Sequence, residues 1–106
     1  MPTRRAARVR AKLAFVVGFV GTELKFTARL WDFSPFGLSV KTSREIAIGT
    51  IFRLGIQVEA DIFRASAIVR SHIPGGFGVE FLSMTPMDRQ TMRRLYLRLV
   101  MAARTA

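Results

Sequence analysis

The stretch Thr50-Ile-Phe-Arg-Leu-Gly-Ile-Gln-Val58 decides the fold class of this 106-residue chain. Every second position in it is apolar, in the order Phe52, Leu54, Ile56, Val58. The positions between them hold Ile51, Arg53, Gly55 and Gln57. An alternation with a period of two predicts a β-strand that buries one face and exposes the other.

Similar β-forming segments lie on both sides of this strand. They are short, rich in Val, Ile, Phe and Thr, and separated by turn residues. We expect strands over residues 13–20, 24–31, 37–42, 50–58, 63–72 and 77–82. Six short strands with tight links predict an all-β fold, a closed or nearly closed antiparallel β-barrel over residues 13–82, and closure would also remove exposed sheet edges.

The period changes after residue 82. Thr85-Pro86-Met87-Asp88 is a good helix start, with Thr85 as the N-cap, Pro86 at the first helical position and Asp88 near the positive end of the dipole. Apolar residues then recur at helical spacing, at Met92, Leu95, Tyr96, Leu99, Val100 and Ala103. We therefore predict one amphipathic C-terminal helix over residues 85–103, which packs its apolar stripe on the barrel. Its arginine-rich remainder leaves contact with an acidic membrane, RNA or a protein open.

The chain is strongly basic, with a formal net charge of +10. Its positive charges gather in two blocks, one near the N-terminus and one in and directly after the predicted helix, at Arg89, Arg93, Arg94, Arg98 and Arg104. Such an imbalance predicts an anionic partner or surface, but it does not choose among a nucleotide, a nucleic acid and a membrane.

Composition excludes several classes of protein. The chain has no cysteine, which excludes disulfides, cysteine-ligated metal sites and thiol catalysis. His72 is the only histidine and has no catalytic motif around it, and no metal-binding cluster is visible, so we do not expect an enzyme or a metal cofactor. The longest apolar run, over residues 13–20, is too short to cross a bilayer and lacks a signal-peptide cleavage site, so we expect a cytoplasmic protein.

Two short motifs carry the binding chemistry. The first is Arg4-Arg5-Ala6-Ala7-Arg8, whose guanidinium groups can grip phosphate oxygens and stack on a purine. The second is Asp32-Phe33-Ser34-Pro35-Phe36-Gly37, in which the Asp32 carboxylate can accept paired donors such as those of a guanine edge. Pro35 and Gly37 would turn the chain, with Gly37 taking a positive φ or admitting a ligand close to the backbone. Together the motifs predict a pocket for a planar ligand that carries phosphate.

In their order, spacing and strand context these motifs resemble the PilZ family, bacterial receptor domains for the second messenger cyclic di-GMP. The resemblance covers nearly the whole chain as a single domain, including residues 26–31 before the second motif and residues 49–56 and 78–82 as later strands. It implies a six-stranded β-barrel with a C-terminal helix, and a cyclic di-GMP site. By this resemblance the site consists of Arg4, Arg8, Asp32, Ser34 and Gly37, with Arg5 as an adjacent contributor.

The resemblance also implies how the domain would signal. Residues 1–12 would be a mobile basic arm that orders on the ligand, and a separate effector protein would read the change. Family outputs include motility, biofilm formation and virulence. Two alternatives stay open: a PilZ-like module that binds only proteins, and a small nucleic-acid-binding barrel that stacks bases on Trp31, Phe33 and Phe36. The intact motifs argue against the first, and we consider nucleic acid the weaker partner.

Overall fold

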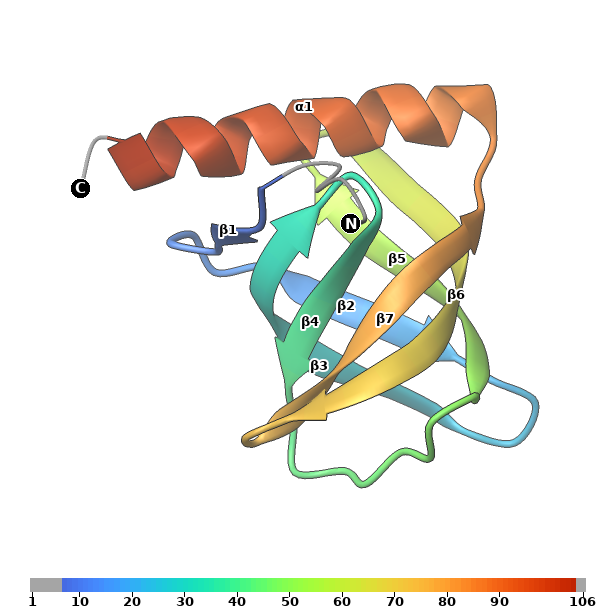
Figure 1. The fold of residues 1–106 in the computed structure, drawn as a ribbon. Helices are drawn as coiled ribbons and strands as arrows, with labels where there is room; N and C mark the ends of the chain where they lie inside the picture. The colour runs from blue at the N-terminus through green and yellow to red at the C-terminus, as the bar shows by residue number, and fades with distance from the viewer. Residues whose placement is uncertain (1–6, 105–106) are drawn as a thin grey trace, which may run out of the picture.

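Seven β-strands and one α-helix make up residues 7–104, the part of the chain that this computed structural model describes (Figure 1). The strands are β1 (Val9–Arg10), β2 (Val16–Val20), β3 (Lys25–Ser34), β4 (Gly37–Lys41), β5 (Ile51–Val58), β6 (Asp61–Ile73) and β7 (Gly76–Ser83). The helix is α1 (Pro86–Arg104). The predicted barrel and C-terminal helix are confirmed, and β1 is an additional strand.

Six of the strands close into a ring. The order along the sheet is β1-β3-β2-β5-β6-β7-β4, and a further pairing of β3 with β4 completes the barrel. All of the pairings are antiparallel. The strand β1 pairs with the last part of β3, at Phe33 and Asp32, beyond the point where β2 ends its own pairing with β3. The N-terminal segment is thereby attached to the end of β3 that carries the second motif.

The interior of the barrel is apolar and rich in phenylalanine. The alternation predicted for β5 is confirmed, because Phe52, Leu54, Ile56 and Val58 are all buried. Phe19 stacks on Phe26 with ring centroids 5.0 Å apart, and other rings meet edge to face around them. This core fixes which side chains of each strand face outward.

The helix α1 lies across one end of the barrel (Figure 1). Its predicted start is confirmed: the backbone N–H of Asp88 donates to Thr85 Oγ1 at 3.0 Å, and the Thr85 hydroxyl donates to the Asp88 carboxylate at 2.7 Å. Three side chains of the apolar stripe are fully buried against the barrel, namely Met92, Leu95 and Leu99. Of the other predicted stripe residues, Tyr96 and Val100 are half-buried, and Ala103 is exposed near the end of the helix.

The other end of the barrel is covered by residues 42–50, which connect β4 to β5 without forming a strand (Figure 1). Ile46 from this connection is buried in the core. Its carbonyl oxygen lies 2.7 Å from Nε2 of His72 on β6. Backbone hydrogen bonds of Thr42 with Gly75, and of Gly49 and Thr50 with Val69, attach the two ends of the connection, so one buried side chain and a few hydrogen bonds hold it against the barrel.

Candidate functional site

The two sequence motifs meet in the structure, although 24 positions separate the residues that touch. Arg8 Nη1 donates to Asp32 Oδ1 at 2.8 Å. The contact arises because β1 follows Arg8 immediately and pairs with β3, with Arg10 opposite Asp32. The pair is open to solvent, with 49% of the Arg8 side chain and 22% of the Asp32 side chain exposed.

A β-bulge presents Asp32 to the outside of the barrel. The pairing of β3 with β4 shifts between Leu30 and Asp32, which leaves Trp31 as the extra residue. Up to Leu30 the strand alternates between exposed and buried residues, and then Trp31 and Asp32 are both partly exposed before Phe33 returns to the core. Without the extra residue, strict alternation would have aimed Asp32 at the barrel interior.

Ser39 of β4 completes the setting of Asp32, and sequence reasoning missed it. Its hydroxyl donates to Asp32 Oδ1 at 2.6 Å, on the same carboxylate oxygen that Arg8 uses. Ser39 is itself buried, so it holds the carboxylate in place from below. Within residues 7–104, no hydrogen-bond donor contacts Oδ2 of Asp32. That oxygen is therefore able to accept a hydrogen bond from a ligand.

The remaining residues of the second motif shape the turn between β3 and β4. Ser34 is buried; its hydroxyl accepts from the backbone N–H of Phe36 at 3.2 Å and donates to the carbonyl of Gly37 at 3.4 Å. Gly37 does not have a positive φ, a conformation found at Gly49 and Gly75 among the described glycines. It is needed because a Cβ there would lie 2.2 Å from the Val79 carbonyl oxygen on β7. Of the two reasons that the sequence offered for this glycine, a positive φ is therefore wrong, and close packing of two strands requires the glycine.

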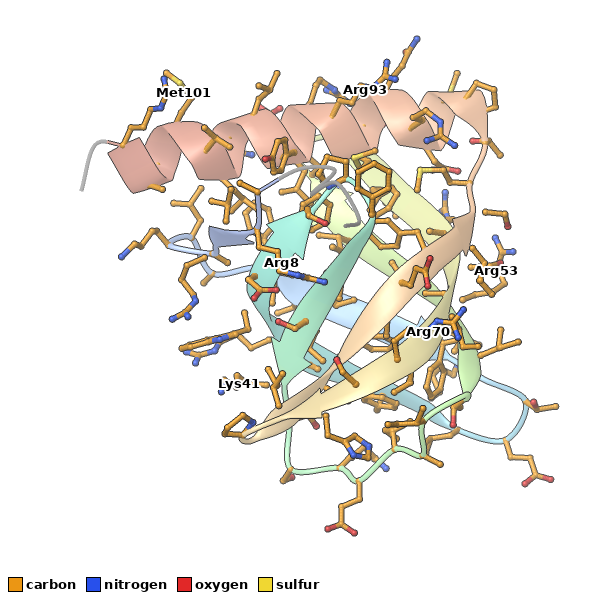
Figure 2. All side chains as sticks on the ribbon, in the orientation of Figure 1. Arg8, Lys41, Arg53, Arg70, Arg93 and Met101 are labelled. Carbon is orange, nitrogen blue, oxygen red and sulfur yellow. The ribbon has the colours of Figure 1, made fainter. Side chains whose placement is uncertain are left out.

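A small pocket lies beside the Arg8–Asp32 pair. Its volume is about 260 Å³, and it is lined by Arg8, Phe36, Arg70, Ser71, Gly78, Val79 and Glu80. Arg70 Nε donates to Glu80 Oε1 at 2.8 Å along the pocket wall. Figure 2 labels Arg8 and Arg70 on this side of the barrel. Arg70 was visible in the sequence only as one outward-facing position of a predicted strand, and its place near Arg8 depends on how the barrel closes.

Cations surround the indole ring of Trp31 next to this site. The guanidinium carbon of Arg10 lies 3.8 Å from the ring centroid, and Nζ of Lys41 lies 4.3 Å from it. Such contacts are favourable because the face of the ring is negative. They add positive charge beside Asp32, on the side of the site away from Arg70.

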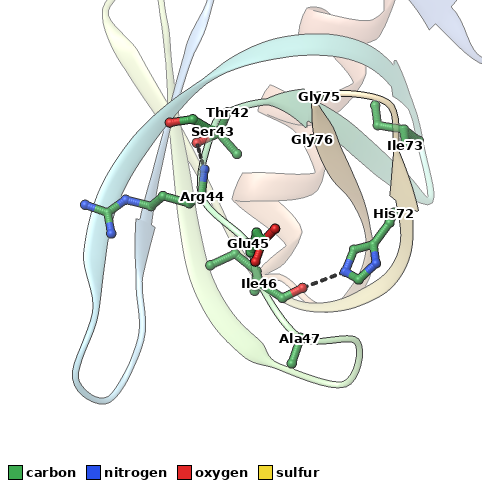
Figure 3. Close-up of a pocket in the computed structure, with 10 residues that line it drawn as sticks. All are labelled: Thr42, Ser43, Arg44, Glu45, Ile46, Ala47, His72, Ile73, Gly75 and Gly76. Carbon is green, nitrogen blue, oxygen red and sulfur yellow. Dashed lines mark hydrogen bonds between the residues drawn. The ribbon is translucent and has the colours of Figure 1, made fainter.

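A larger hollow lies at the other end of the barrel, with a volume of about 740 Å³ (Figure 3). It is lined largely by the connection over residues 42–50 and by the hairpin between β6 and β7. It contains none of the residues predicted for the site. Residues 7–104 hold no group of three or more potential metal ligands, in this hollow or elsewhere.

Of the predicted site residues, the structure thus brings Arg8, Asp32, Ser34 and Gly37 to one end of β3 and β4. Arg4 and Arg5 lie outside the described residues. The observed arrangement supplies a guanidinium group, a carboxylate oxygen open to a donor, and a shallow recess between them. These groups can bind a ligand that carries both an anion and paired hydrogen-bond donors.

Comparison with protein-family models decides the relationship. The model of the PilZ domain matches residues 2–98. The chain belongs to the PilZ family. PilZ is a family of cyclic di-GMP receptors in bacteria, and the PilZ domain is a non-catalytic receptor or adaptor module, which agrees with our expectation that the chain is not an enzyme.

Solved structures support the PilZ fold. The PilZ domain of YcgR from Escherichia coli, in a structure with c-di-GMP, aligns with a TM-score of 0.77 at 18% identity, over 98% of this chain and 96% of that one. The Bacillus subtilis inhibitor of motility (MotI/DgrA) aligns with a TM-score of 0.74 at 17% identity, over 98% and 54%. MrkH of K. pneumonia in its apo state aligns with a TM-score of 0.78 at 14% identity, over 99% and 55%. This PilZ chain thus spans about half the length of the last two proteins. A search of curated protein sequences found no match.

The PilZ chain has no helix in its described part that is long and apolar enough to cross a membrane.

Proposed function

We propose that this chain is a receptor for cyclic di-GMP, and that Arg8 and Asp32 are the centre of its binding site. The observation that carries the proposal is the 2.8 Å contact between Arg8 and Asp32, because it joins the two motifs that the family resemblance assigns to the ligand. In this proposal Oδ2 of Asp32 accepts hydrogen bonds from a guanine edge, and Arg8 binds a phosphate or a guanine.

The ion pair between Arg8 and Asp32 does not prevent Arg8 from reaching a ligand. The Arg8 side chain is half exposed and that of Asp32 partly exposed, and pairs that solvent reaches contribute only about 0–1 kcal/mol. A phosphate offers the guanidinium group an equivalent or better partner. Ser39 keeps its hydrogen bond to Asp32, so the carboxylate stays in place when Arg8 moves.

The remaining motif residues have distinct parts in this proposal. Ser34 and Gly37 act through the shape of the turn, since Ser34 is buried and Gly37 packs against β7. The recess of about 260 Å³ is smaller than the roughly 300–1,000 Å³ of typical small-molecule sites, so it would hold part of a cyclic dinucleotide. We assign the rest of the ligand to the N-terminal segment, through Arg4 and with Arg5 as an adjacent contributor.

Signalling in this proposal follows from a change in the surface around the site. Ligand binding would rearrange the segment that carries Arg8, and a separate effector protein would recognise the altered face. The processes controlled would be those of the family, such as motility, biofilm formation or virulence. We place the receptor in the cytoplasm.

Calorimetric titration of the purified protein with cyclic di-GMP tests the proposal, with cyclic di-AMP and GTP as competing ligands. Selective binding of cyclic di-GMP is expected. Arg8→Ala and Asp32→Asn should each weaken it by roughly 10- to 100-fold, because each change removes a hydrogen bond to a charged group.

The ion pair between Arg94 and Asp61 provides a matched control. It is also exposed, with a distance of 2.6 Å, and it lies between α1 and the start of β6. Arg94→Ala and Asp61→Asn should leave the titration unchanged. Equal weakening by both pairs of variants would contradict the proposed site. Binding of unrelated nucleic acid that is lost steeply with salt and is indifferent to Asp32 would instead favour the nucleic-acid-binding alternative.

A further inference from the structure

The outward face of α1 carries large apolar side chains. Met87, Leu97 and Met101 are 76%, 61% and 59% exposed, whereas Met92, Leu95 and Leu99 of the same helix are fully buried. In Figure 2 Met101 points away from the barrel, and so does Arg93, which is nearer the start of the helix. The barrel therefore uses only one side of α1, and the apolar residues on the other side do not contribute to the core.

These exposed residues lie along one outward face of α1, here called the ridge, in which Leu97 and Met101 are direct neighbours and Met87 stands apart nearer the start of the helix. Met87 and Met101 are 14 positions apart, which is close to four helical turns, and Leu97 precedes Met101 by four positions. The rise of an α-helix then spreads the ridge over roughly 21 Å. A ridge of this length on a straight, convex element can lie against a flat surface.

Arginines flank the ridge on both sides. Arg94 pairs with Asp61, and Arg98 lies over the ring of Phe15. By contrast, Arg89, Arg93 and Arg104 are exposed and make no ion pair with any residue among 7–104. Asp88 is the single acidic residue of the helix and lies in its first turn. Its carboxylate accepts hydrogen bonds from the Thr85 hydroxyl and from the backbone N–H of Arg64. The outer face of α1 thus combines apolar side chains with uncompensated positive charge.

We propose that this outer face, formed by Met87, Leu97 and Met101 with Arg89, Arg93 and Arg104, binds an anionic membrane surface. A lipid interface accepts both components, since the arginines meet phosphate headgroups while the apolar side chains enter the acyl boundary. A nucleic acid would use the arginines but would gain little from the apolar ridge. The inference rests on α1 alone and holds whether or not the barrel binds a nucleotide.

Co-sedimentation of the full chain with vesicles tests this proposal. The probes are vesicles of phosphatidylcholine alone and vesicles in which part of it is replaced by phosphatidylglycerol. Binding to the anionic vesicles is expected, with little binding to the neutral ones, and it should weaken as salt is raised. Absence of binding to the anionic vesicles at low salt, or equal binding to both kinds, would overturn the proposal.

Two double variants separate the contributions of charge and of apolar insertion. Arg93→Gln with Arg104→Gln should reduce partitioning by roughly 25-fold, at about five-fold for each arginine near the surface. Its matched control, Arg29→Gln with Arg44→Gln, removes the same charge from exposed positions on β3 and in the connection over residues 42–50, and should have a much smaller effect. If both double variants lose binding equally, net charge alone is responsible and the assignment to α1 is wrong.

Leu97→Gln with Met101→Gln should also reduce vesicle binding, by roughly ten-fold or more. Val16→Gln with Ile51→Gln is its control, because these side chains are 61% and 57% exposed but lie on β2 and β5. Thermal unfolding confirms that each variant is folded, and all four positions are exposed enough for this to be expected. An unchanged partition coefficient for folded Leu97→Gln with Met101→Gln would overturn the proposal, since a purely ionic contact would not need the ridge.

Discussion

The two ends of the barrel are closed in different ways. At one end α1 buries three full side chains, satisfies its own backbone hydrogen bonds and is capped at Thr85. At the other end residues 42–50 bury only Ile46, whose carbonyl is hydrogen-bonded to His72, and backbone hydrogen bonds to Gly75 and Val69 tie the two ends of the connection to the barrel. A regular helix supplies many contacts that form together, whereas an irregular connection depends on a few. The candidate site lies at the end of the barrel that α1 closes. Exposed polar groups there do not weaken the packing of the apolar core.

The largest change in stability is expected at the end of the barrel that α1 closes. Leu99→Ala removes a fully buried side chain from the contact between α1 and the barrel, and should lower the free energy of unfolding by about 2–5 kcal/mol. Denaturant titration measures the change. Leu97→Ala is the matched control in the same helix; because Leu97 is 61% exposed, it should change stability by less than about 0.5 kcal/mol. Similar losses for both variants would mean that α1 does not pack as described.

Ile46→Ala tests the other end of the barrel and should lower the free energy of unfolding by roughly 2 kcal/mol. This is at the low end for such substitutions, because an irregular connection can move into part of the space that the side chain leaves. Hydrogen exchange adds a sharper readout. The backbone N–H of Gly49, which donates to the Val69 carbonyl at 2.8 Å, should exchange faster in the variant, while the amides of α1 should not. Faster exchange throughout the molecule would show that the two ends open together and would remove the contrast between them.

Asp88 ties the start of α1 to β6, since its carboxylate accepts from the Arg64 backbone N–H at 3.0 Å as well as from Thr85. Partial burial raises the pKa of Asp88, but these hydrogen bonds and the nearby Arg64 charge outweigh it, so the pKa lies below its ordinary value. A lowered pKa stabilises the fold above the unfolded value of about 4, and this stabilisation is lost as the pH falls through the folded value.

Asp88→Ala should lower the free energy of unfolding by about 1 kcal/mol near neutral pH, because it removes the hydrogen bonds that the carboxylate accepts from Thr85 and from the Arg64 backbone. The difference from the unmodified protein should shrink as the pH falls below about 4, because the unmodified protein then loses the same stabilisation. Unfolding titrations at several pH values measure this. Met87→Ala, in the same turn of the helix, is a control, because Met87 is 76% exposed and carries no titratable group. A difference that grows toward low pH would contradict the assigned sign.

The smallest effect is expected for His72→Phe. It keeps a ring at this position but removes the 2.7 Å hydrogen bond to the Ile46 carbonyl, which should cost about 0.5–1.5 kcal/mol. Thermal unfolding checks the size of the loss, and exchange at Gly49 checks its location. If the loss exceeds that of Ile46→Ala, the hydrogen bond and not the apolar side chain secures this end.

Periodicity in the sequence was sufficient to predict most of the fold. The strands β3 to β7 and the start of α1 follow alternation, turn residues and capping preferences that act locally. The first predicted strand, over residues 13–20, is shorter in the structure, where β2 is Val16–Val20. The strand β1 was missed because two residues carry no period, and it exists through its pairing with β3.

The candidate site was harder to predict from the sequence. Side-chain chemistry together with the family resemblance singled out Arg8 and Asp32, and the structure places them in contact. Ser39, Arg70 and Glu80 come from three strands whose neighbourhood depends on barrel closure, so no local signal marks them. The bulge at Trp31, which turns Asp32 outward, is likewise a property of the pairing between two strands.

One hydrogen bond gives the two ends of the chain a mechanical connection. The Tyr96 hydroxyl donates to the carbonyl of Ala7 at 2.8 Å, and Ala7 directly precedes Arg8. A displacement of the segment that carries Arg8 must therefore either break this bond or pull on the middle of α1. By thermodynamic reciprocity, a load applied to the helix would bias the position of Arg8 to the same degree. A single tyrosine thus links the segment beside Arg8 directly to α1.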